Sequence, residues 1–279
     1  GKWTDNIGDV SSGGNTPVVE GHMLNEYRYR SVYKGNGKYF NADGSVNPAG
    51  GPKGGMIRTE EDMNWVKAMM DAGYKFKPGN SIGKANIYYG DYIYADVNGD
   101  GVYGDSDDEE FQGRSKTPKY NFGFQASAAW NGFDISMVWA GAAGFDIYWG
   151  PTAGYNAAKT EWGNNIAQRI ADDHYFYDPS NPDDPRTNIN GKYPRMTYLD
   201  GNVQNNASSN RWLYNGDYIK LKNLSLGYTL PQKWVTKVAM QNARIYVSAE
   251  NLLTITSFEG QDPESATGMG YAPFRSIAI

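Results

Sequence analysis

The chain lacks cysteine altogether and has only two histidines, His22 and His174, among its 279 residues. Disulfides, thiolate-bound zinc and cysteine nucleophiles are therefore excluded, and a histidine-rich metal site is disfavoured. An excess of basic residues is also missing, since the formal net charge is -5 and the pI is about 5.1. Binding to nucleic acid or to an anionic lipid surface requires clustered lysine and arginine, so the overall charge argues against both.

Long apolar runs are absent too. No run approaches the roughly 20 residues that a membrane helix requires, and the first residues show no basic stretch followed by an apolar signal core. Aromatic residues, in contrast, make up 14% of a chain with 34 glycines and a mean hydropathy of -0.67. This combination is typical of a membrane β-barrel, whose strands alternate apolar residues facing lipid with polar residues facing the lumen.

The clearest pattern is an alternating hairpin around Asn131-Gly132. Asn-Gly favours a two-residue type I′ turn, and each flanking segment is about ten residues long, which a tilted strand needs to cross a bilayer. The apolar positions are Tyr120, Phe122, Phe124, Ala126, Ala128, Trp130, Phe133, Ile135, Met137 and Trp139. We therefore predict a transmembrane hairpin over residues 119–145.

This sorting of residues between two faces is compatible with two architectures. Trp130 and Phe133 flank the turn, as expected for an aromatic girdle at a water–lipid boundary. The buried core of a β-sandwich would sort residues in the same way, so the hairpin alone leaves both open.

Two further segments, 223–230 and 244–250, repeat the alternation and favour the barrel. Arg244 and Glu250 fall on the polar face, where charges are tolerated in a wet lumen and costly in a dry core. The connections are also uneven, because tight links alternate with very long segments, as in outer-membrane barrels.

Helices are expected only in the long connections. Thr59 and Asp62 form a capping-box pattern, apolar residues follow at helical spacing, and Gly73 provides a stop. Trp162, Ile166 and Ile170 suggest a second, shorter helix. Residues 22–32 and 87–95 read as strands.

Four ordered motifs resemble one known family. They are DVNGDG at 96–101, KYNFGFQASAAWNGFDISMVWAGAAGFDIY at 119–148, NRWLYNGDYIKLKNLSLGYTLPQKW at 210–234 and RIYVSAENLLT at 244–254. Together they resemble the C-terminal part of SusC/RagA-type TonB-dependent transporters of the bacterial outer membrane.

The resemblance implies an all-β fold: part of an antiparallel transmembrane barrel of 22 strands, with long extracellular loops that carry short helices. Residues 1–279 would be its C-terminal part, with an acidic loop region at 88–118, the hairpin, an extracellular loop at 146–215 and the last strands at 216–279. The N-terminal plug domain is expected to be absent from this chain. Transport would then belong to the whole receptor.

The resemblance also implies partners and cargo. Such receptors work with a SusD-like surface lipoprotein, receive energy from TonB through the N-terminal part, and contact outer-membrane lipid. Their cargo is a bulky nutrient, an oligosaccharide or, as a second choice, an oligopeptide.

The loop that begins at Asp96 has the spacing of a calcium site. Oxygen-bearing side chains fall at its positions 1, 3, 5 and 12, glycine is at position 6, and a carbonyl is available at position 7. The proposed ligands are Asp96, Asn98, Asp100, Val102 and Asp107. Asp107 stands where an EF-hand has glutamate, and its shorter arm reaches less easily for two-oxygen coordination. We predict a structural Ca²⁺ that orders an external loop; the alternative is an acidic, solvated turn.

Aromatic residues in the long loops are candidates for stacking on sugars, because ring faces match the apolar C–H faces of pyranoses. The candidates are Trp149, Tyr155, Trp162, Tyr175 and Tyr177. The alternative is that these rings pack loops against each other or against a lid protein.

Enzymatic activity is not expected. Residues 99–104 spell GxGxxG, but no helix pattern follows and the neighbouring aspartates would repel a pyrophosphate. Residues 79–83 spell GxSxG, but a nucleophile elbow needs a helix there. The competing hypothesis to the importer is a secreted, calcium-stabilised β-sandwich that binds carbohydrate.

Overall fold

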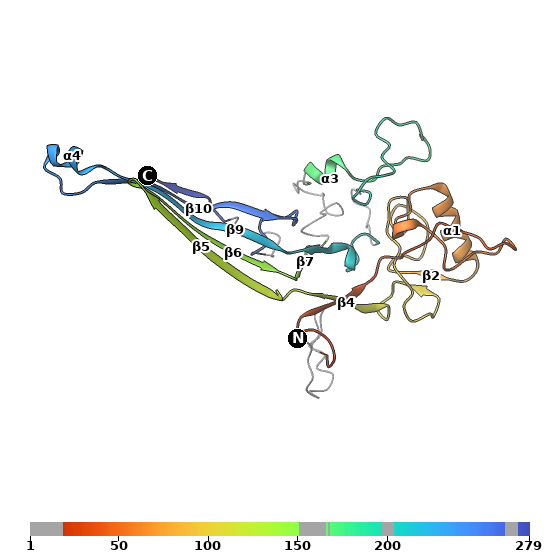
Figure 1. Ribbon diagram of the computed structural model, residues 1–279. Helices are drawn as coiled ribbons and strands as arrows, with labels where there is room; N and C mark the ends of the chain where they lie inside the picture. Colours follow the sequence, from red (N-terminus) through yellow and green to blue (C-terminus); the bar gives the residue numbers. More distant parts are fainter. Residues whose placement is uncertain (1–18, 151–165, 167, 197–203, 266–272) are drawn as a thin grey trace. The chain divides into compact units, whose positions relative to one another are not determined.

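The computed structural model describes residues 19–150, 166, 168–196, 204–265 and 273–279 (Figure 1). The chain divides into two compact units. The first comprises Gly1–Arg114 and Trp149–Leu213, and the second comprises Ser115–Tyr148 and Tyr214–Ile279. The predicted calcium loop therefore belongs to the first unit and the alternating strands belong to the second.

The first unit is built from short elements around an aromatic core. β1 (Glu26–Arg30) pairs with β4 (Glu109–Ser115), and β2 (Lys75–Phe76) pairs in parallel with β3 (Val102–Tyr103). Its helices within the described residues are η1 (Lys53–Gly55), α1 (Glu60–Asp71), α3 (Gln168–Asp172) and η3 (Asn210–Trp212). The buried core consists of Tyr33, Ile57, Met63, Trp65, Val66, Met69, Phe76, Ile87, Ile93 and Tyr103.

Helix α1 confirms its sequence pattern. The Thr59 hydroxyl accepts a hydrogen bond from the Asp62 amide at 3.3 Å, and the Asp62 carboxylate accepts one from the Thr59 amide at 2.9 Å. These two bonds form the capping box and satisfy amides that a helix start leaves unpaired. Gly73 follows with φ at 97°. The helix buries Trp65 completely and so fastens itself to the core.

The second unit is dominated by one antiparallel sheet, in which the long strands run side by side (Figure 1). In spatial order its strands are β11 (Ser276–Ala278), β10 (Arg244–Thr256), β9 (Tyr218–Thr229), β6 (Phe133–Ala143) and β5 (Tyr120–Trp130). β7 (Asp146–Tyr148) and β8 (Leu213–Asn215) form a separate pair, and α4 (Gln232–Val235) with η4 (Thr236–Val238) lies between β9 and β10.

The hairpin predicted at Asn131-Gly132 is present. Asn131 and Gly132 have φ values of 49° and 86°, as a type I′ turn requires. The ladder runs without interruption from Trp130↔Phe133 to Tyr120↔Ala143.

A β-bulge keeps the apolar residues of β9 on one face. The aliphatic residues of β9 are odd-numbered as far as Leu221 and even-numbered from Leu224 onwards. Side chains alternate between the two faces of a regular strand, so without an irregularity these two groups would lie on opposite faces. Lys222 is the extra residue opposite β6, and the register with β10 shifts at the same place, where Asn251 has φ at 50°. The one extra residue in the bulge shifts the alternation by one position, so that both groups of apolar residues lie on the same face.

Other expectations hold in part. Residues 22–32 contain β1, but residues 87–95 make only isolated bridges, such as Met56↔Tyr92 and Val32↔Tyr94. Consecutive residues Tyr92, Ile93 and Tyr94 are all buried there, so the segment packs on every side instead of alternating.

The region 88–118 is not all loop, since it includes β3 and β4. Trp162 lies outside the described residues; of the other two residues that suggested a second helix, Ile170 lies in α3 and Ile166 is not helical.

The described strands form an open five-stranded sheet and not a closed barrel. None of the helices in the described ranges is both long and apolar enough to cross a bilayer.

Candidate functional site

One face of the five-stranded sheet is apolar across its whole width. The register aligns Ala128, Ile135, Leu226 and Val247 in one row across four strands. Several large side chains of this face are exposed, with Phe122 at 44%, Leu226 at 48% and Val247 at 39%, whereas Leu221 is buried. A β-sandwich would cover these residues with a second sheet. The exposed apolar face is therefore a surface that requires an apolar environment.

The opposite face is polar and carries a cross-strand ion pair. Its side chains include Asn121, Gln125, Ser127, Asp134, Ser136, Asn223, Ser225, Thr229, Arg244, Ser248 and Glu250. Arg244 of β10 donates to both carboxylate oxygens of Asp134 in β6, at 3.0 and 2.6 Å. A bidentate pair between non-adjacent strands fits a water-facing surface, as predicted for Arg244.

A buried lysine marks the same polar face further along β9. Lys220 is 1% exposed, and its ammonium lies 2.5 Å from Asp262 and 2.8 Å from Glu264. Lys222 adds a contact of 2.6 Å to Glu264. Burial opposes ionisation of Glu264, but hydrogen bonds from both lysines outweigh it and hold the pKa of this carboxyl below its usual range. The network holds residues 262–264 against the sheet.

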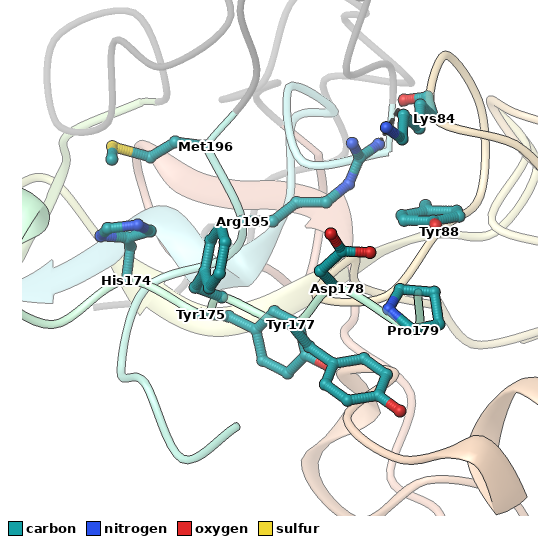
Figure 2. Close-up of a pocket in the computed structure, with 10 residues that line it drawn as sticks. Lys84, Tyr88, His174, Tyr175, Tyr177, Asp178, Pro179, Arg195 and Met196 are labelled. Atoms are coloured by element: carbon teal, nitrogen blue, oxygen red, sulfur yellow. Dashed lines mark hydrogen bonds between the residues drawn. The ribbon is translucent and has the colours of Figure 1, made fainter. Parts of the chain in front are cut away.

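The first unit contains a pocket of about 370 Å³ (Figure 2). Two nearby segments, 174–179 and 193–196, meet around it through backbone hydrogen bonds such as Tyr175 N to Tyr193 O, and Lys84 and Tyr88 join them from far away in the sequence. Its lining combines rings with charged and polar groups: Lys84, Tyr88, His174, Tyr175, Phe176, Tyr177, Asp178, Pro179, Arg195 and Met196. Rings beside hydrogen-bonding groups are a suitable combination for a polyhydroxylated ligand.

A buried ion pair supports one wall of this pocket. Arg195 Nε and Nη2 donate to the two carboxylate oxygens of Asp91 at 2.7 and 3.1 Å, and Asn205 Nδ2 donates to the same carboxylate at 2.8 Å. The Arg195 guanidinium also lies 5.5 Å from the ring centre of Tyr88. Complete burial raises the pKa of Asp91 to about 6, although the arginine opposes the shift. These contacts fix the arginine, and Figure 2 shows it extended towards Lys84.

The predicted aromatic residues separate into three groups. Tyr175 and Tyr177 both line the pocket. Tyr175 is 1% exposed and donates its hydroxyl to the Arg58 carbonyl at 2.8 Å, whereas Tyr177 is half-buried and meets Tyr89 edge-on. Trp149 is outside this pocket, 6% exposed, with the Arg169 guanidinium 4.4 Å from its ring centre. Tyr155 and Trp162 lie outside the described residues, and the sugar-binding role of all five stays a prediction.

The acidic loop is closed by its own backbone amides. Asp96 accepts from the amides of Gly99 and Gly101 at 2.7 and 2.9 Å, and Asp100 accepts from the Val102 amide at 2.8 Å. The Asn98 side chain accepts from the Asp100 amide at 2.9 Å. Among the described residues, no group of three or more acidic, histidine or cysteine side chains is assembled to hold a metal. The donor types suit calcium, and the calcium site remains a prediction.

Asp108, rather than Asp107, is the side chain that closes this loop. It is fully buried and accepts from the amides of Val97 at 2.6 Å and Gly104 at 2.7 Å. The Asp107 side chain is exposed, and its amide donates to Asp105. The role of Asp107 as a calcium ligand at position 12 stays a prediction, and the spacing did not indicate that Asp108 would be the buried acid of the loop.

Comparison with known proteins gives one consistent group of relatives. The chain is 30% identical over 193 residues to the TonB-dependent receptor P3 of Formosa agariphila, a match that covers 69% of this chain and 17% of that receptor. It is 26% identical to the TonB-dependent receptors P26 and P39 of the same organism, over 62% and 63% of this chain. No protein-family profile matches the chain.

The chain therefore belongs to the TonB-dependent receptors, and the family resemblance of its motifs is confirmed at that level. It spans 16–17% of the length of these curated relatives. Because the relatives are receptors and not catalysts, the non-enzymatic interpretation is confirmed as well.

Solved structures of one transporter are also similar to the chain. The RagAB peptide importer in its closed-closed state gives a TM-score of 0.46 at 23% identity, over 73% of this chain and 21% of that one. The open-open state gives a TM-score of 0.40 at 24% identity, over 68% and 19%. The family assignment rests on the curated relatives, because scores below 0.5 do not establish a shared fold.

Proposed function

We propose that this chain forms the C-terminal barrel section of a receptor in the bacterial outer membrane. The observation that carries the proposal is the exposed apolar face of the five-stranded sheet, opposite a polar face that bears an ion pair. In a transmembrane barrel the first face meets lipid and the second meets water. In this proposal the whole receptor forms a closed barrel of 22 strands, to which this chain contributes its long antiparallel strands.

The receptor imports a bulky nutrient with energy supplied through TonB, and a SusD-like surface lipoprotein is its partner outside the cell. We favour an oligosaccharide as cargo, with an oligopeptide as the second choice. The pocket beside Tyr177 supports the first choice, because tyrosine rings, Lys84 and Asp178 suit the C–H faces and hydroxyl groups of a sugar. Calcium bound at 96–107 stabilises the first unit in this proposal.

The orientation of the sheet can be tested with neighbouring residues on opposite faces. The chain has no cysteine, so it contributes only the introduced thiol when Ile135→Cys or Ser136→Cys is labelled with a fluorescent probe. In the reconstituted receptor, a lipid-borne quencher should quench the probe at 135, and an aqueous quencher should reach the probe at 136. Protection of position 135 from both quenchers would favour a covered sandwich face and contradict the proposal.

Cargo is tested in cells. Deletion of the receptor should abolish growth on one class of oligosaccharide and leave growth on its monosaccharides unchanged. Loss of growth on oligopeptides, with all oligosaccharides still used, would replace the first choice with the second. Unchanged growth on both classes would contradict an import function.

A further inference from the structure

The link between β9 and β10 exposes an unusual amount of apolar surface for a short turn. Residues 231–242 contain α4 and η4, and only Val235 among their large apolar side chains is buried. Trp234 is 53% exposed, Val238 64% and Met240 53%. These three side chains would all contact water unless lipid or a protein covered them.

The same link is locally basic although the whole chain is acidic. Lys233 and Lys237 are both exposed, and residues 231–242 contain no aspartate or glutamate. Tryptophan with lysine on a short amphipathic segment is the composition of protein surfaces at a membrane interface. The charge of the link matters more for such a contact than the net charge of the whole chain, because electrostatic attraction to a membrane falls off within about a Debye length.

The link also begins at the end of the sheet where the apolar face has its most aromatic row. The last row of that face, beside the Asn131-Gly132 turn, consists of Trp130, Phe133, Tyr228 and Ile245. Trp130 is 80% exposed, and the rings of Phe133 and Tyr228 lie 4.4 Å apart. The Thr229 amide donates to the Gly132 carbonyl at 2.7 Å, which holds the start of the link at this end of the sheet.

We propose that residues 231–242 form an interfacial anchor in which Trp234, Val238 and Met240 enter the headgroup boundary of the bilayer. Lys233 and Lys237 bind the phosphates of anionic phospholipids at the same depth. The inference rests on the proposed function, because it needs the apolar face to meet lipid. It adds a second, lateral contact with the membrane surface, made by a turn instead of by the strands.

The test uses the receptor that contains this chain, reconstituted in phosphatidylcholine vesicles with and without phosphatidylglycerol. A fluorescent probe on Met240→Cys reports the link, and a probe on Ala126→Cys, in the middle of the apolar face, is the matched control. Quenchers are a lipid brominated near the headgroup, a lipid brominated deep in the chain, and aqueous iodide.

The proposal expects quenching at position 240 by the shallow bromines and protection from iodide, both stronger with phosphatidylglycerol. Lys233→Gln combined with Lys237→Gln should remove that difference, because each lysine near an anionic surface shifts the bound population by about fivefold. Equal quenching with and without phosphatidylglycerol would overturn the assignment to anionic lipid.

Two other results would overturn the anchor and leave the barrel intact. If deep bromines quench the probe at 126 while iodide freely reaches position 240, the link lies in water. If neither bromines nor iodide reach position 240, a protein covers it. Absence of lipid quenching at position 126 would instead contradict the proposed function itself.

Discussion

At the scale of single residues, Gly227 makes room for the ion pair on the polar face. It lies in β9 between Asp134 of β6 and Arg244 of β10. A Cβ atom at this position would collide with Arg244 Nη2 and would lie 2.5 Å from Asp134 Oδ1. Only glycine therefore lets the two side chains cross the strand that separates them.

Gly227→Ala should uncouple Asp134 from Arg244 while leaving the sheet folded. Both ends of the pair are flexible, so they move aside instead of unfolding the strand. A double-mutant cycle with Asp134→Asn and Arg244→Gln should show favourable coupling in the native background and none with Gly227→Ala. Ser225→Ala, on the same face of the same strand, is the control and should keep the coupling. Coupling that survives Gly227→Ala would contradict this interpretation.

Arg195 is expected to be the most sensitive charged residue of the first unit. Its side chain is 9% exposed and that of Asp91 is fully buried, so Arg195→Ala leaves an uncompensated carboxylate in the interior. Loss of one partner of a buried pair costs about 3–5 kcal/mol. Denaturant unfolding measures the change, and Arg186→Ala, which removes a guanidinium that is 74% exposed from its pair with Asp184, should have a smaller effect. A similarly small effect at Arg195 would show that water reaches the pair.

Asp91 should also give the first unit an unusual pH dependence. Its pKa in the folded chain is about 6, above the ordinary value of 3.8. Between about pH 4 and pH 6 the folded state therefore keeps a proton that the unfolded state has lost, so this stabilisation is present below pH 4 and is lost as the pH rises through 6. Unfolding free energies measured across that range should fall for the native chain relative to Asp91→Asn. A difference that rises with pH would reverse the assigned shift.

At the scale of elements, the acidic loop has its oxygen-bearing residues spaced as in a calcium-binding loop, and several of the same residues accept hydrogen bonds from the backbone of the loop. Its carboxylates already accept backbone amides, so any calcium joins a loop that is locally ordered. Calorimetric titration should detect binding of Ca²⁺ at millimolar concentration or below. Asp96→Asn combined with Asp100→Asn should abolish it, whereas Asp183→Asn, an exposed aspartate elsewhere in the unit, should not. No heat at millimolar calcium would establish the solvated-turn alternative.

At the scale of the whole molecule, the two faces of the sheet should respond oppositely to charge. Val247→Lys places an ammonium in the apolar row with Leu226 and Ile135, where it would meet lipid. The expected cost is about 2–4 kcal/mol near the middle of a bilayer, falling towards the interfaces. Ser248→Lys, the next residue on the polar face, is the control. Folding yield and unfolding free energy in lipid vesicles measure both, and equal effects would contradict the membrane assignment.

The hairpin, the sorting of residues between faces, helix α1 and the receptor family were all predictable from the order of the amino acids. These features follow from neighbours in the chain: alternation of period two, Asn131-Gly132 at a turn, and a capping box three residues apart. The bulge at Lys222 was also present in the sequence as a change of parity, although it could be interpreted only once the partner strands were known.

The polar contacts that define the sites could be recognised only in the folded chain. Asp91 lies 104 residues from Arg195, and Lys220 lies 42 residues from Asp262. The same holds for Asp108, which was one acid among several in its loop until burial distinguished it. Local sequence patterns encode the conformation of a segment. A buried charge, in contrast, meets its partner only when folding brings two distant segments together and excludes water around both groups.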